Sequence, residues 1–236
     1  MPRPPRAFVV GGCYHVLNRG NGRARIFRKE ADFLAFVRVL AEGLRRYPVD
    51  LLCWCLMHNH WHLVLRPRRA GAISDLMRWI GVTHVRRHHQ QHGTRGGGHV
   101  YQGRFKSFAI EADRHFLLVC RYVEANPRRA GLVKSAQQWR WSSLGYAAGD
   151  SAGDSPGGGP KDKPSVPLSD WPVDRPGNWV ELVNQTMSKA QLDRLRRSVQ
   201  RGTPFGAERW ALRTARRLGL LNTIRPPGRP RKQKNQ

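Results

Sequence analysis

The sequence predicts an α+β domain over residues 1–148 and a basic helical extension over residues 178–236, with a linker between them. Three observations support this prediction. Strand-like and helix-like hydrophobic patterns alternate three times before residue 148. Residues 149–177 are rich in glycine, proline, serine and aspartate, a composition typical of linkers and surface loops. Two further helical stretches, at about 179–200 and 207–218, are predicted in the extension.

The charge of the chain points to a polyanionic partner. The sequence holds 42 Lys and Arg against 16 Asp and Glu, a formal net charge of +26. Nucleic acid is the leading candidate, and a membrane surface is the alternative. No segment approaches the ~20 apolar residues of a spanning helix, and the first residues lack the apolar core of a secretory signal. With only four scattered cysteines, we expect a cytoplasmic, nucleoid-associated protein.

Residues 8–18 predict the first strand, which runs into a basic, turn-rich loop over residues 18–23. Arg19 and Arg23 lie in this loop. Its backbone amides and guanidinium groups could hold the phosphates of a nucleic acid. The alternative is an ordinary connection between two elements, which needs no ligand.

Two amphipathic helices are predicted next. The first covers Glu30 to Tyr47 and ends at Pro48, because proline cannot continue a helix. The second starts at Ser74, a residue favoured at helix N-termini, and runs to the pair His88–His89. The basic residues of the second helix could contact a nucleic-acid backbone or could simply be solvated.

The stretch from Leu51 to Leu65 predicts a buried strand with a possible break near His58–Asn59. Within a strand, residues two apart share a face, so His60 and His62 should point the same way. Two neighbouring imidazoles on a rigid strand are a natural half of a metal site. The alternative is that they are packed or hydrogen-bonded histidines of the core.

A structural zinc site would combine these histidines with Cys53 and Cys55. In a continuous strand, however, the cysteines and the histidines have opposite parity and should face opposite sides of the sheet. A bulge would be needed to bring them together. This pattern disfavours the zinc interpretation.

The stretch from Val100 to Ile110 interleaves aromatic residues with cations, among them Arg104 and Lys106. Such a mixture suits stacking on bases and neutralisation of phosphates. Equally, the aromatic residues could belong to the core and the cations to the solvated surface.

A third helix is predicted from Asp113 to about Ala125, with one apolar stripe facing the core. Tyr122 and Asn126 lie one turn apart on its other side. Pro127 predicts that the helix ends there, and Asn126 could simply shape this end.

The motifs in this order resemble the REP-associated tyrosine transposases of bacteria, a group of the single-tyrosine HUH transposases. The resemblance covers about residues 8–146. The matching segments are Tyr14-His-Val-Leu-Asn-Arg-Gly, Leu56-Met-His-Asn-His-Trp-His-Leu, Tyr101-Gln-Gly-Arg-Phe-Lys-Ser, Cys120-Arg-Tyr-Val-Glu-Ala-Asn-Pro-Arg-Arg-Ala-Gly-Leu-Val and Trp141-Ser-Ser. One departure is His58, where the family usually carries proline.

The resemblance implies a ferredoxin-like domain that nicks single-stranded DNA at hairpin-forming repeats. It implies a divalent Mg²⁺ or Mn²⁺ ion on His60 and His62, with Asn126 as the third ligand. Tyr122 would be the nucleophile, and the products would be a 5′-phosphotyrosine and a free 3′-hydroxyl. The alternative is a regulator on the same fold that binds DNA or RNA without cleaving it.

The end of the chain also resembles the tails of this group. Arg229 and Arg231 lie in a Gly-Arg-Pro-Arg sequence that resembles a minor-groove hook, in which arginines enter a narrow A·T groove. The alternative is a solvated appendage. The protein is expected to be a monomer or a homodimer.

Overall fold

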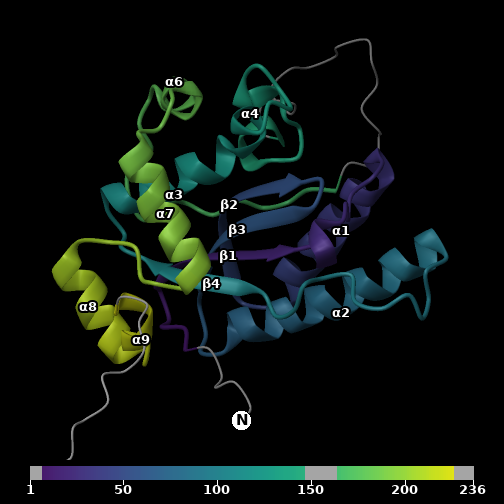
Figure 1. Ribbon diagram of the computed structural model, residues 1–236, viewed down its shortest axis with the longest axis horizontal. Coiled ribbons are helices and arrows are strands. Elements are labelled where there is room, and N and C mark those ends of the chain that lie inside the picture. Colours follow the sequence, from purple (N-terminus) through teal and green to yellow (C-terminus); the bar gives the residue numbers. More distant parts are fainter. Residues whose placement is uncertain (1–6, 147–163, 226–236) are drawn as a thin grey trace, which may run out of the picture.

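The computed structural model describes residues 7–146 and 164–225. Four antiparallel strands form one sheet in the order β2-β3-β1-β4 (Figure 1). In chain order, the first six strands and α-helices are β1 (Cys13–Arg19), α1 (Glu30–Arg46), β2 (Val49–Met57), β3 (His60–Pro67), α2 (Ala72–His92) and β4 (Lys106–Ile110). This is the βαββαβ arrangement of a ferredoxin-like domain. The predicted α+β class is confirmed.

The predicted strand over residues 51–65 is a hairpin. β2 ends at Met57, β3 begins at His60, and these two residues pair across a turn made by His58 and Asn59. The chain therefore breaks at the place where a break was expected. This turn sets the parity of every side chain that follows it on β3.

Helices α1 and α2 cover one face of the sheet (Figure 1). The expected stripe of α1 is buried there, with Phe36, Val37 and Leu40 inaccessible to solvent. The prediction that Ser74 caps α2 is wrong. Gly71, with a φ of 77°, turns the chain in the left-handed conformation, so the helix already begins at Ala72.

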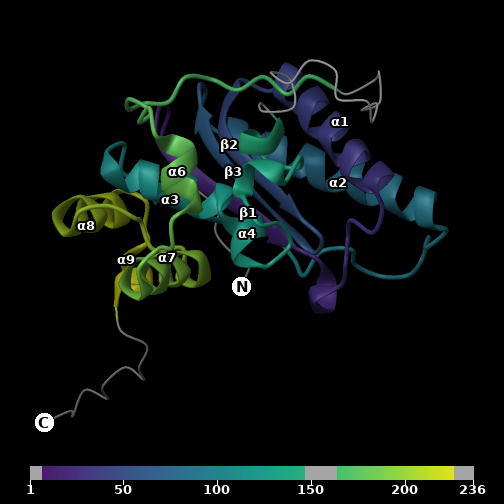
Figure 2. The same ribbon diagram turned by 90° about the horizontal axis from the view of Figure 1, so that it is seen from above.

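Helix α3 (Arg114–Glu124) packs on the opposite face (Figure 2). The Asp113 side chain caps it by accepting a hydrogen bond from the backbone N–H of His115, at 2.8 Å. The apolar stripe of α3 includes Phe116, Val119 and Val123, all fully buried. The helix breaks at Ala125, and a short helix α4 (Asn126–Arg129) follows directly.

The C-terminal part of the chain adds helices to the same side. The predicted helix over residues 179–200 is in fact two helices, α6 (Trp179–Asn184) and α7 (Lys189–Arg201). Ser188 separates them because its hydroxyl caps α7, accepting from the N–H of Gln191 at 3.2 Å. The remaining elements are α8 (Glu208–Arg217), α9 (Leu221–Ile224) and the 3₁₀ turns η1 (Asn21–Arg23) and η2 (Ala136–Gln138).

Both edges of the sheet are covered by chain from outside the first 140 residues. Along β2, the N–H of Ser169 donates to the carbonyl of Leu51 at 2.9 Å, and the Trp171 indole donates to the carbonyl of Leu52 at 2.7 Å. Beside β4, Phe205 donates to the carbonyl of Ala109 at 2.8 Å. Covered edges cannot pair with another strand.

The described part of the predicted linker, residues 164–177, thus lies against the sheet. How the chain divides into folding units at residues 148 and 177 stays a prediction. None of the helices in the described part of the chain is long and apolar enough to cross a bilayer.

Candidate active site

The β2–β3 hairpin places His60 and His62 on the sheet face that α3 covers. The ring of His62 lies 6.0 Å from the ring of Tyr122, centroid to centroid, and 4.9 Å from the ring of His60. Trp61, between the two histidines, points to the opposite face and packs against Phe36 of α1 at 5.7 Å. The predicted metal-binding pair and the predicted nucleophile are therefore neighbours.

The third histidine of the hairpin, His58, takes no part in this arrangement. Its Nδ1 lies 3.2 Å from the carbonyl oxygen of Phe27, and its ring packs edge-on against Phe33 and Trp139. The residue that departs from the family pattern thus belongs to the packing around the turn.

The parity argument for the cysteines is wrong. Cys55 pairs directly with His62 across the hairpin, so Cys53 and Cys55 share a face with the histidines. The reason is the two-residue turn, which restarts the alternation. In the part of the chain that the structure describes, however, no cysteine joins the histidines in a group of three or more metal-ligand atoms. Burial raises the pKa of the Cys55 thiol well above its usual value, which disfavours the thiolate that zinc requires.

Helix α4 contributes two side chains beside the tyrosine. The guanidinium of Arg129 lies over the Tyr122 ring, 4.2 Å from its centroid. The same guanidinium donates to Oδ1 of Asn126 at 2.5 Å. Asn126 is buried, and its Nδ2 has no hydrogen-bond partner among the described residues. Asn126 therefore holds Arg129 over the nucleophile candidate, and its oxygen keeps a second lone pair for another contact.

A third histidine, His15 on β1, completes the group. It is fully buried, and its Nε2 lies 2.8 Å from Nδ1 of His62. The two residues are diagonal neighbours on adjacent strands, since His62 pairs with Leu17. When His62 donates from Nδ1 to His15, the Nε2 of His62 keeps its lone pair. That Nε2 is buried and has no partner among the described residues.

The three imidazoles are neutral at physiological pH. Burial, followed by the charges of Arg19 and Arg129, lowers the pKa of His60 to about 4. Burial also lowers the pKa of His15 to about 3 and that of His62 well below its usual value. A neutral imidazole with a free lone pair is a metal ligand. Asn59 orients His60 in a similar way, because its Oδ1 lies 2.6 Å from the Nδ1 of His60.

These residues fit a divalent cation. The unpartnered Nε2 of His62, the neutral ring of His60 and the carboxamide oxygen of Asn126 form a mixed nitrogen and oxygen donor set. Such a set suits Mn²⁺ readily and Mg²⁺ with retained waters.

Arg19 lies directly across the strand pair from His60. Neither Arg19 nor Arg129 has an acidic partner in residues 7–146 or 164–225. Unpaired guanidinium groups beside neutral ligands favour an anion such as a phosphate.

A cavity of about 490 Å³, here called the Tyr122 cavity, opens beside these groups. Arg19, Arg104 and Lys106, all predicted as DNA contacts, line it together with Tyr122. Its opposite wall comes from α7, which contributes Arg196, Val199 and Gln200. The C-terminal extension therefore closes one side of the site.

The structure does not bring every predicted DNA contact to this cavity. Arg23 lies in the η1 turn, where its carbonyl accepts a hydrogen bond from the Asn59 side chain at 3.2 Å. Arg229 and Arg231 lie outside the described residues, so their role stays a prediction. Sequence reasoning missed His15, Arg129 and Arg196. The basic pair in Asn126-Pro-Arg-Arg, directly after the tyrosine helix, was the signal available for Arg129.

A second group of possible ligands lies where β4 passes into α3. The ligand atoms of Glu111, Asp113 and His115 all lie within 4.8 Å of one another. Each is already used within the protein. Asp113 accepts from the backbone and the ring of His115, and Glu111 accepts from the N–H of Ala207 at 2.6 Å. The bond from Ala207 to Glu111 fastens the C-terminal extension to the segment between β4 and α3.

Residues 9–126 match a family of transposases described as IS200-like, and this match covers half of the chain. The matched segment includes all four strands, the histidine pair and the tyrosine. The chain belongs to the IS200-like transposase family. No curated protein matches this transposase.

Two solved structures are similar to the transposase. One is a REP-associated tyrosine transposase bound to a REP hairpin, with a TM-score of 0.52 and 17% identity over 72% of this chain and 95% of the other. The second is a proposed transposase from Deinococcus radiodurans, with a TM-score of 0.37 and 18% identity over 52% of this chain and 96% of the other. At 17% identity, the first similarity supports the ferredoxin-like fold alone.

Proposed function

We propose that this transposase is a single-tyrosine HUH endonuclease and strand transferase that acts on single-stranded, hairpin-forming DNA. The observation that carries the proposal is the position of Tyr122. Its ring lies beside His62, whose Nε2 is unpartnered, and under the guanidinium of Arg129. The tyrosine thus lies beside an imidazole with a free lone pair and a guanidinium with no acidic partner, and it lines a cavity that holds further cations.

The reaction is a displacement at phosphorus. The Tyr122 oxygen forms a bond to phosphorus while the bond from phosphorus to the 3′ oxygen breaks. The electron pair stays on the 3′ oxygen, which takes up a proton and leaves as a hydroxyl, and the phenol proton passes to water. The products are a 5′-phosphotyrosine and a free 3′-hydroxyl. Because the diester is exchanged and not hydrolysed, a 3′-hydroxyl can reverse the step without ATP.

Each residue of the site has a separate task in this step. Arg129 stabilises negative charge on the Tyr122 oxygen, and Asn126 holds Arg129 in place. Arg19, Arg104 and Lys106 bind the phosphates on either side of the one that reacts. A Mg²⁺ or Mn²⁺ ion held by His60, His62 and Asn126 would polarise the scissile phosphate and neutralise the charge that develops on it.

Several observations support DNA as the substrate. The chain carries a net charge of +26, and the Tyr122 cavity is lined by four cations, Arg19, Arg104, Lys106 and Arg196. The REP-associated transposase of similar fold is bound to a REP hairpin. A REP-like hairpin with single-stranded flanks is therefore the substrate class that we propose for this chain.

The direct test is a search for the covalent adduct. The full chain is incubated with single-stranded hairpin oligonucleotides and Mn²⁺ or Mg²⁺, and denaturing electrophoresis detects protein joined to DNA. Tyr122→Phe should lower adduct formation by at least about 10³-fold while DNA binding persists, because only the nucleophilic oxygen is lost. Tyr14→Phe is the matched control. Its hydroxyl accepts from the N–H of Val9 on the other face of the sheet, so the adduct should persist.

The outcomes separate the proposed functions. An adduct that survives Tyr122→Phe would show that another residue is the nucleophile. Tight binding of the hairpin without any adduct in the parent protein would instead favour the non-cleaving DNA- or RNA-binding regulator.

A further inference from the structure

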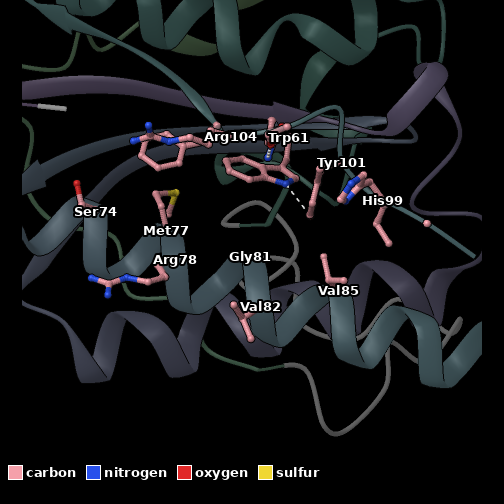
Figure 3. A pocket seen from close by; sticks show the side chains of 15 residues that line it. Trp61, Ser74, Met77, Arg78, Gly81, Val82, Val85, His99, Tyr101 and Arg104 are labelled. Atoms are coloured by element: carbon pink, nitrogen blue, oxygen red, sulfur yellow. Dashed lines mark hydrogen bonds between the residues drawn. The ribbon is translucent and has the colours of Figure 1, made fainter. Parts of the chain in front are cut away.

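A second cavity, of about 540 Å³, lies on the opposite face of the sheet, between α2 and the loop before β4. We call it the Trp61 cavity. Figure 3 shows Met77 and Val85 rising from α2 toward Trp61 and Tyr101. Its size falls within the range of pockets that bind small ligands. Nothing in the proposed chemistry of Tyr122 uses it.

The aromatic wall of the Trp61 cavity is held by a chain of hydrogen bonds. The indole N–H of Trp61 donates to the Tyr101 hydroxyl at 3.0 Å, and this hydroxyl lies 2.7 Å from Nδ1 of His84 (Figure 3). Trp61 and Tyr101 are only 3% and 8% exposed. These rings are held in fixed positions, so a ligand that contacts them would not have to order a mobile side chain.

Gly81 keeps the floor of the cavity open. It lies in the middle of α2, where glycine destabilises a helix relative to alanine. It also lines the cavity, and a β-carbon placed on it would meet no atom within 4 Å. Neither close packing nor an unusual backbone angle requires glycine at this position. A larger side chain would fill the space that the cavity now leaves free.

The Trp61 cavity and the Tyr122 cavity share a wall. Asn18, Gly103 and Arg104 line both of them. The Asn18 side chain donates to the carbonyl of Gly103 at 3.1 Å, which ties the loop to the end of β1. A strand with one phosphate in the Tyr122 cavity would therefore pass directly over the rim of the Trp61 cavity. Arg104 stands at that rim, whereas Arg78 of α2, which also lines the cavity, is paired with Asp75 at 2.6 Å.

We propose that the Trp61 cavity receives one unpaired nucleobase of the DNA strand whose phosphate occupies the Tyr122 cavity. The inference rests on the proposed function for the identity of the strand. Aromatic and apolar walls suit the face of a base, and Arg104 at the shared rim suits an adjoining phosphate. The occupant is thus a base of single-stranded DNA that lies within a few nucleotides of the reacting diester.

The test combines a cavity-filling variant with a photoreactive strand. Gly81→Phe puts an aromatic ring into the cavity, and Gly81→Ala is the matched control that removes the glycine without filling the space. The probe is a single-stranded 12-mer of thymidine and 5-iododeoxyuridine, compared with an abasic 12-mer that has the same phosphates. We measure affinity by fluorescence anisotropy and map the cross-links by mass spectrometry.

We expect cross-links to Trp61, Met77 or Tyr101 in the parent and in Gly81→Ala, and at least a tenfold loss of these cross-links in Gly81→Phe. The parent should bind the thymidine strand about tenfold more tightly than the abasic strand, and Gly81→Phe should remove most of this difference. Affinity for the abasic strand should not change. If Gly81→Phe does not fold, Val85→Phe fills the same space one turn further along α2.

Two outcomes would overturn the inference. Either the cross-links map only outside the cavity, or Gly81→Phe keeps both the cross-links and the preference for bases. The adduct assay separates this failure from failure of the proposed function. An adduct with no effect of Gly81→Phe would refute the base pocket alone, whereas a base-dependent effect without an adduct would refute the cleavage chemistry alone.

Discussion

Two groups of buried and half-buried histidines lie on opposite faces of the sheet. His15, His60 and His62 face α3, whereas His84 and His88 belong to α2 on the other side. Burial lowers the pKa in both groups, to about 3 for His15 and for His84 and to about 4 for His60 and for His88. A lowered pKa therefore does not distinguish a site from a core.

An unpartnered ring nitrogen alone does not separate the two groups either, because both ring nitrogens of His88 lack a partner among the described residues. The surroundings of the rings do separate them. Nδ1 of His84 has a partner in the Tyr101 hydroxyl, and its ring packs against Phe36 at 5.0 Å. This is a satisfied histidine of the core. His62 instead combines an unpartnered Nε2 with a tyrosine ring and a nearby unpaired arginine. The proposed site is set apart by a tyrosine, a free lone pair and an arginine without an acidic partner that lie together.

The strongest test of the difference between the two histidine groups is to remove the proposed metal ligands one at a time. We expect His60→Ala and His62→Ala each to abolish adduct formation and to weaken Mn²⁺ binding by more than about 100-fold. Each change removes a proposed metal ligand, and the loss should exceed the one that follows removal of a residue that only orients a ligand. His88→Ala is the control from the other group and should keep the Mn²⁺ affinity of the parent. Isothermal titration with Mn²⁺ measures the metal affinity of each variant, and denaturing electrophoresis measures its adduct formation.

The cysteines supply a second control for the same titration. Cys55 shares the face of His62, so Cys55→Ser tests whether a thiol takes part in the site. We expect no change in Mn²⁺ affinity. Release of a bound metal by this substitution would restore the zinc interpretation, and a loss in His88→Ala equal to that in His62→Ala would end the distinction between the two histidine groups.

The next largest effect concerns Asn126, which has no counterpart in the α2 group. Asn126→Asp keeps an oxygen for a cation and for Arg129, so metal-dependent activity should persist. Asn126→Leu removes both contacts, and we expect losses of Mn²⁺ affinity and of adduct formation that exceed the 10- to 100-fold typical of an outer-shell partner. If both variants bind Mn²⁺ as tightly as the parent, Asn126 only positions Arg129.

Local patterns in the sequence predict the fold well but the surroundings of the site only in part. Alternation put His60 and His62 on one face, and helical spacing put Tyr122 and Asn126 one turn apart. The position of His15 depends on the pairing register of β1 with β3, which no local pattern specifies.

The error over the cysteines has a similar cause. A turn of two residues restarts the alternation, so counting along a continuous strand puts Cys55 on the wrong face. Arg196 reaches the Tyr122 cavity from α7, some seventy residues beyond the tyrosine. Only the tertiary fold brings such distant residues together, so local sequence patterns could not identify Arg196.

His15 provides a sharper and smaller test, because it acts on His62 and not on the ion. His15→Phe removes the ring nitrogen that lies 2.8 Å from Nδ1 of His62, and we expect Mn²⁺ affinity to fall by roughly 10- to 100-fold. His15→Gln places an amide oxygen near the position of the lost Nε2 and should restore most of the affinity. Equal losses in His15→Phe and His15→Gln would point to core packing as the role of His15.

The smallest expected effect comes from the other group, where a change should alter stability but not metal binding. Tyr101→Phe leaves Nδ1 of His84 buried without its partner, which costs about 1–3 kcal/mol of unfolding free energy. In a chain of this size, the melting temperature should fall by roughly 2–10 °C. On the proposed function, Mn²⁺ binds the folded state, so adding it should raise the melting temperature of the parent and of Tyr101→Phe by the same amount. His62→Ala should lose this rise. If Tyr101→Phe loses it as well, the two faces are coupled, and His84 is more than a satisfied histidine of the core.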